Sequence, residues 1–112
     1  MTYKPVLHDA EEITDYIVML STEPIDEGLV EDYFWGCKAV LKSVIIDTLI
    51  NDNPDKHIRC SKKEKEYERL PSDTMPPLIV ENGIVMDGNH RLRVAKKKGM
   101  NEIKIYEVIA TE

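Results

Sequence analysis

The chain has 112 residues, which is enough for one domain with a single hydrophobic core. Apolar residues make up 42% and charged residues 32%, a balance typical of globular rather than disordered chains. No apolar stretch reaches the roughly 20 residues of a membrane helix, and the first residues show no signal-peptide pattern. The two cysteines, Cys37 and Cys60, form no metal or redox motif. We therefore expect a cytoplasmic protein without a membrane partner or a protein-bound metal.

Charge is divided unevenly along the chain. The net charge is −6, but residues 1–55 carry 3 basic and 12 acidic side chains, whereas residues 56–112 carry 12 basic and 9 acidic ones. An acidic chain is poorly suited to neutralise the phosphates of a duplex, which argues against a nucleic-acid partner. The basic second half can still hold a small anion such as a nucleotide.

The acidic part, residues 1–54, is predicted to be helical. Asp9 is a candidate N-cap with Glu12 three residues on, and this first helix ends before Pro24. A second helical pattern runs from about Asp26 to Ile50. We expect the helical side of the core to include Tyr16, Ile17, Leu41, Val44 and Ile45. The neighbouring aromatic residues Tyr33, Phe34 and Trp35 are predicted to lie in the core or an interface rather than to stack on bases.

Residues 55–75 are predicted to form a charged loop with one helical turn at most, and residues 76–112 form the remaining part of the single domain 1–112. Leu78–Val80 and Ile84–Met86 flank Asn82-Gly83, the strongest signal for a two-residue hairpin turn. Both arms are continuously apolar, which predicts burial on both faces. A helix follows, with Asn89 as its expected N-cap and Gly99 as its stop, and residues 103–109 are predicted to be a strand.

The segment Asp87-Gly88-Asn89-His90-Arg91 is the main candidate site. The start of a helix has unpaired N–H groups and the positive end of the helix dipole, which together favour an anion. We expect Gly88 to let a ligand approach the backbone closely, and His90 and Arg91 to reach the same anion from the first turn. Two cationic groups are unfavourable at this end of a helix unless an anion is bound there.

The same five residues resemble the signature of the ParB/sulfiredoxin-like superfamily. They are similar to Gly-Cys-His-Arg of sulfiredoxin, Asp-Gly-His-His-Arg of archaeal free serine kinases, the DGQHR-type domains and Gly-Glu-Arg-Arg of ParB proteins. The resemblance covers about the last third of the chain. It implies an α+β fold, with N-terminal helices packed on a small mixed sheet.

The resemblance also implies that Gly88, Asn89, His90 and Arg91 bind the phosphates of a nucleotide, either ATP or a related one with Mg²⁺. Asn89 stands where sulfiredoxin has its catalytic cysteine, so sulfinic acid reduction is not expected. A helix-turn-helix domain like that of ParB would not fit in the chain. The loop residues His57 and Arg59 are possible auxiliary phosphate ligands, although two exposed loop side chains are the simpler interpretation.

Three functions remain open at this point. The first is an ATP-type phosphotransferase or phosphohydrolase, with His90 and Asp87 as candidate catalytic residues, although Asp87 fits a turn role better. The second is a non-catalytic regulator or inhibitor that engages a protein partner through its acidic helices. The third is a ParB-like nuclease, which the net charge disfavours. The proximity of an acidic residue from positions 64–73 to His90 and Arg91 would separate the first two.

Overall fold

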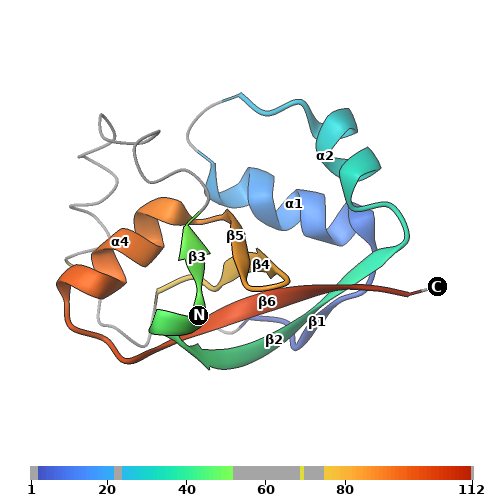
Figure 1. The fold of residues 1–112 in the computed structure, drawn as a ribbon. Helices are drawn as coiled ribbons and strands as arrows, with labels where there is room; N and C mark the ends of the chain where they lie inside the picture. Colours follow the sequence, from blue (N-terminus) through green and yellow to red (C-terminus); the bar gives the residue numbers. More distant parts are fainter. Residues whose placement is uncertain (1–2, 22–23, 52–68, 70–74, 112) are drawn as a thin grey trace.

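The computed structural model describes residues 3–21, 24–51, 69 and 75–111, and it has the predicted α+β architecture. Its centre is a six-stranded mixed sheet with the strand order β1-β2-β6-β4-β5-β3 (Figure 1). The strands are β1 (Val6–Leu7), β2 (Cys37–Ile45), β3 (Ile50–Asn51), β4 (Leu78–Glu81), β5 (Ile84–Asp87) and β6 (Glu102–Ala110). The helices are α1 (Ala10–Leu20), α2 (Glu27–Tyr33) and α4 (Asn89–Lys97), with a 3-10 turn, η1, at Ile46–Thr48.

The helices form two layers on opposite faces of the sheet. β4 is the strand that both layers cover: Leu78 and Val80 pack in the cluster under α4, whereas Ile79 packs in the cluster under α1. All three side chains are 1% exposed or less. Figure 1 shows α1 and α2 together on one side of the strands and α4 apart from them. The end of β5 and the start of α4 therefore lie beside a strand that is buried on both faces.

The prediction of one helix from Asp26 to Ile50 is wrong beyond Tyr33. Gly36, at φ +77°, interrupts the helical backbone, and Cys37–Ile45 form β2, which pairs with β6 along its whole length. The apolar residues of β2 serve both layers: Ala39 packs under α1 and Val44 packs toward α4. Because the apolar side chains of β2 alternate between the two faces of the sheet, their spacing in the sequence is similar to that of the apolar residues of a helix.

The burial predictions for this half are accordingly mixed. Tyr16 and Ile17 are buried as expected, but Leu41 and Val44 are only partly buried and Ile45 is 56% exposed. Among the aromatic residues, Phe34 is buried, whereas Tyr33 and Trp35 are 56% and 76% exposed. None of the helices in the described residues is long and apolar enough to cross a membrane.

The local signals in the sequence are confirmed. The Asp9 carboxylate accepts a hydrogen bond from the Glu12 N–H at 2.9 Å and so caps α1. β4 and β5 form the expected hairpin, with positive φ at both Asn82 and Gly83, as a type I′ turn requires. Gly99, at φ +73°, ends α4. The expectation that both hairpin arms are buried on both faces holds only for β4, because β5 exposes Met86.

Candidate functional site

The turn between β5 and α4 is built around Gly88. Its φ is +104°, a backbone conformation that glycine adopts without the steric cost of a side chain. Gly88, and not Asn89 as expected, is the N-cap, and its carbonyl accepts the N–H of Leu92 at 2.9 Å. Since glycine has no side chain to cap the first turn, the start of α4 has the electrostatic character that favours an anion.

Gly88 is also required by packing. A Cβ atom at this position would lie 2.6 Å from Leu78 Cδ2 and 2.8 Å from Arg91 Nη2. The close approach that the sequence assigned to a ligand is thus made by the protein itself, because the Arg91 guanidinium lies directly against the turn.

Arg91 is buried, with 3% of its surface exposed, whereas the sequence predicts a side chain that reaches an anion from the first turn of the helix. Its Nη1 donates to the carbonyl oxygens of Pro77 at 2.7 Å and Pro76 at 3.2 Å. Its Nη2 forms an ion pair with Asp87 Oδ2 at 3.0 Å. Arginine is rarely buried unless it is paired, and these contacts provide the pairing. Arg91 therefore connects both ends of the β4–β5 hairpin to the first turn of α4.

Tyr16 of α1 completes this buried network, a role that its position in an apolar helical pattern does not indicate. Its hydroxyl donates to the Pro77 carbonyl and lies 3.4 Å from Arg91 Nη1. Burial raises the pKa of the Tyr16 hydroxyl, although the neighbouring Arg91 charge opposes the increase. The sequence signal for this network was the pair Pro76-Pro77, because residues without N–H groups interrupt regular backbone pairing and their carbonyls then accept hydrogen bonds from side chains.

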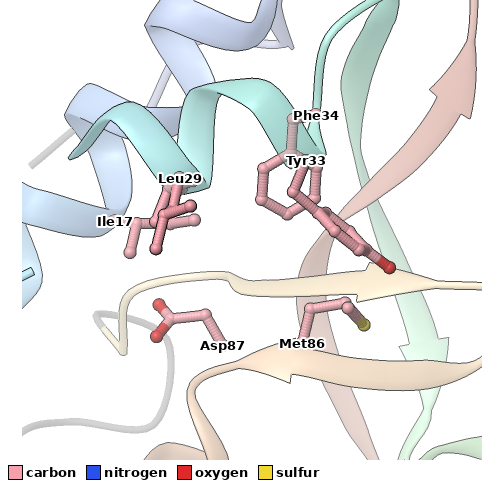
Figure 2. Close-up of a pocket in the computed structure, with 7 residues that line it drawn as sticks. Ile17, Leu29, Tyr33, Phe34, Met86 and Asp87 are labelled. Carbon is pink, nitrogen blue, oxygen red and sulfur yellow. The ribbon is translucent and has the colours of Figure 1, made fainter. Parts of the chain in front are cut away.

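A bulge in β5 directs side chains from the turn toward the helices. Ile79 pairs with Asp87 and Val80 pairs with Val85, so Met86 is an extra residue in β5. Met86 and Asp87 consequently both face the α1–α2 layer (Figure 2), although successive residues of a regular strand point to opposite faces. Bulges commonly re-aim side chains in this way next to functional sites.

Met86 and Asp87 line a groove of about 270 Å³ next to the turn between β5 and α4. Its wall is apolar, and among the described residues Asp87 is the only charged one that lines it (Figure 2). Tyr33 and Phe34 contribute aromatic rings packed edge to face, with centroids 4.9 Å apart. Ile17, Leu29 and Val30 also line the groove.

The charged groups around the groove are partly neutralised. The Asp87 side chain is 34% exposed, and its negative charge is paired with the Arg91 guanidinium. Tyr33 donates its hydroxyl hydrogen to Glu81 Oε1 at 2.9 Å, and this hydrogen bond to a carboxylate raises the pKa of Tyr33. His90 is partly buried in the first turn of α4. The site therefore combines one apolar groove, one carboxylate and one helix N-terminus.

The structure brings Asp87, Gly88, Asn89, His90 and Arg91 together at one turn, and the phosphate-binding role of these residues stays a prediction. Several of the predicted features lie outside the described residues. These are the auxiliary candidates His57 and Arg59, the acidic residues of positions 64–73, and the predicted loop 55–75 apart from Arg69 and Met75. Within the described ranges, no cluster of three side chains is suited to hold a metal ion.

Comparison with known proteins supports the fold. No protein-family model and no curated protein matches the chain. The structure is similar to the N-domain of a pNOB8-like ParB protein in the C2221 crystal form, with 25% identity and a TM-score of 0.55. That match covers 64% of this chain and 30% of the ParB chain. A second structure of a pNOB8-like ParB N-domain gives 21% identity and a TM-score of 0.43, and covers 64% of this chain and 28% of its own.

The fold is therefore that of a ParB N-domain, in agreement with the resemblance of Asp87–Arg91 to the ParB/sulfiredoxin-like superfamily. The chain spans less than a third of the length of the ParB structures that it matches.

Proposed function

We propose that this protein binds a nucleotide, with the phosphates at the N-terminus of α4 and the base in the groove beside Asp87. The observation that carries the proposal is that a helix start behind an obligatory glycine adjoins an apolar groove of about 270 Å³ with aromatic walls. Backbone N–H groups and the helix dipole suit phosphate oxygens, and an apolar pocket with a few polar groups suits a base and its sugar.

The residues divide into two groups in this proposal. The backbone N–H groups of Asn89 and His90, together with the His90 side chain, contact the phosphates. The Asp87 carboxylate accepts a hydrogen bond from a sugar hydroxyl or, with the phosphates, coordinates a magnesium ion. Arg91 is a positioning residue, because its guanidinium holds the two proline carbonyls and Asp87 beneath the turn. It fixes the shape of the site and adds positive charge below it.

The finer proposal is that the bound nucleotide is ATP or a relative and that the protein transfers or hydrolyses a phosphoryl group. Such chemistry depends mainly on positioning and charge stabilisation, which a rigid turn with fixed dipoles provides. In this finer proposal His90 and Asp87 are the residues that handle a proton at the phosphates.

The experiment is thermal unfolding with ATP, ADP, CTP, GTP and inorganic phosphate, each with and without magnesium. A ligand at 100 times its dissociation constant stabilises the folded state by about 2.7 kcal/mol, which raises the midpoint by several degrees. We expect His90→Ala and Tyr33→Ala to reduce the shift, and Lys96→Ala, on the exposed end of α4, to retain it. No shift with any of these compounds would reject the site. A shift without phosphate release in the presence of magnesium would support binding and reject hydrolysis.

A second candidate function is protein binding through α2. From Asp26 to Asp32 the chain has four acidic residues and no basic one, and Leu29 and Trp35 are 67% and 76% exposed. An acidic, partly apolar surface suits a basic partner. This proposal predicts salt-sensitive binding of a basic partner protein that Glu27→Lys abolishes and that nucleotides leave unchanged.

A further inference from the structure

A second cavity, of about 290 Å³, lies on the opposite side of α1 from the groove. Its apolar lining includes three tyrosines, which come from three separate parts of the chain: Tyr3 before β1, Tyr16 in α1 and Tyr106 in β6. The Tyr16 ring contacts the other two edge to face, with centroids 6.2 Å from Tyr3 and 4.9 Å from Tyr106. Tyr16 and Tyr106 are 6% and 1% exposed, so they form a fixed inner wall, together with Leu7 at 4%.

The tyrosine hydroxyls of this inner wall are already engaged by the protein. Tyr16 donates to the Pro77 carbonyl, and Tyr106 donates to the Lys4 carbonyl at 2.8 Å. The two rings therefore offer a ligand aromatic surface rather than free hydroxyl donors. Aromatic surface attracts apolar groups and, through the ring quadrupole, cations.

The rim of the cavity carries the charge. Lys4 and Glu12 both line the cavity and form an ion pair with each other at 3.3 Å, and Glu12 also accepts the His8 N–H at 3.2 Å. Asp15 also lines the cavity, and among the described residues no cation lies within ion-pair distance of its carboxylate. Met19, 60% exposed, lies one turn further along α1 at the same opening.

We infer that this cavity binds a small organic cation, an alkylammonium whose apolar body rests on the tyrosines and Leu7 and whose charge lies near Asp15. A metal ion would need several oxygen ligands, which the aromatic wall does not supply. An anion would be repelled by Asp15, because the positive charge of Lys4 is already paired with Glu12, and a neutral apolar molecule would gain nothing from Asp15. The cavity lies at the lower end of the size range of ligand pockets, so the ligand is small.

The test compares choline with 3,3-dimethylbutan-1-ol, which has the same shape without the charge, in a titration of protein with ¹³C-labelled methionine methyl groups. We expect choline to shift the Met19 signal in the millimolar range and to leave Met86, in the groove across α1, unchanged. Butylammonium should act like choline, and the neutral alcohol should bind more weakly. Equal binding of the alcohol and choline, or no Met19 shift up to the solubility limit, would overturn the inference.

Two variants make the test specific. Asp15→Asn should weaken choline binding about twofold to fivefold, the range for a charge pair that involves an exposed carboxylate. Tyr3→Leu should also weaken binding, because it keeps an apolar wall but removes the aromatic ring. Glu11→Gln is the matched control, since Glu11 is exposed on the same helix and does not line the cavity. If Asp15→Asn binds choline as the control does, the carboxylate is not part of a cation site.

Discussion

Replacing Arg91 by alanine should destabilise the fold strongly, because the guanidinium is the buried donor for two carbonyls. The variant leaves the Pro76 and Pro77 oxygens without their charged donor, and hydrogen bonds of this kind contribute about 1.5–3 kcal/mol each. The ion pair with Asp87 adds less, since Asp87 is 34% exposed and water screens it. We expect a total loss of about 3–5 kcal/mol, the range found when one partner of a buried charged pair is removed.

This loss is a large part of the stability of such a domain, which is about 6–17 kcal/mol at 0.05–0.15 kcal/mol per residue. The midpoint of thermal unfolding should fall by about 10–20 °C. Urea unfolding followed by far-UV circular dichroism is the suitable assay, because Trp35 is 76% exposed and its fluorescence reports unfolding poorly. Lys96→Ala, an exposed change in the same helix, should stay within about 0.5 kcal/mol of the wild type. A loss below about 1 kcal/mol for Arg91→Ala would refute the structural role and make the side chain available to a ligand.

Three further outcomes follow from the described contacts. Gly88→Ala should lower the free energy of unfolding in urea by about 2–3 kcal/mol, because the positive φ is strained and the new Cβ lies 2.6 Å from Leu78. The control Gly28→Ala, at a position with no positive φ, should be neutral or stabilising, and equal effects of the two variants would contradict the argument. Burial raises the pKa of Tyr16, so the folded state keeps the hydroxyl proton to a higher pH than the unfolded chain, and stability should fall as the pH rises above about 10. Tyr16→Phe should flatten this alkaline decline of the unfolding midpoint, and an unchanged decline would show that other groups cause it. Asp9→Ala should cost about 1 kcal/mol through loss of the α1 cap, and an unchanged urea midpoint would show that the cap is not needed.

The features that the sequence predicts correctly depend on neighbouring residues. The hairpin at Asn82-Gly83, the cap at Asp9 and the stop at Gly99 each need a particular backbone angle or a side chain three residues away. Gly99 shows this clearly: its N–H donates to the Lys96 carbonyl and the next N–H donates to Ala95, so one short segment contains the whole motif. Such signals can be found without knowledge of the tertiary structure.

The features that were missed depend on residues far apart in the chain. β2 has the apolar content of a helix or a strand, and its pairing with β6, about sixty residues later, decides between them. The inward position of Arg91 depends on Tyr16, 75 residues away, and on the diproline 14 and 15 residues before it. A sequence pattern suggests an exposed arginine because most arginines are exposed. The bulge at Met86, which opens the groove, also has no signature in a continuously apolar run.

The position of β6 has a consequence for folding during synthesis. Among the described strands β6 is the last in chain order, yet it lies between β2 and β4 and is the only one that joins the β1–β2 pair to the β4–β5–β3 group. Until residues 102–110 leave the ribosome, these two groups have no common strand, and the apolar faces of both stay open to water. Contacts of high sequence separation slow folding and expose strand edges in the meantime. A nascent chain that ends before residue 102 should therefore remain sensitive to proteolysis, and protection should appear in one step once β6 is free to insert.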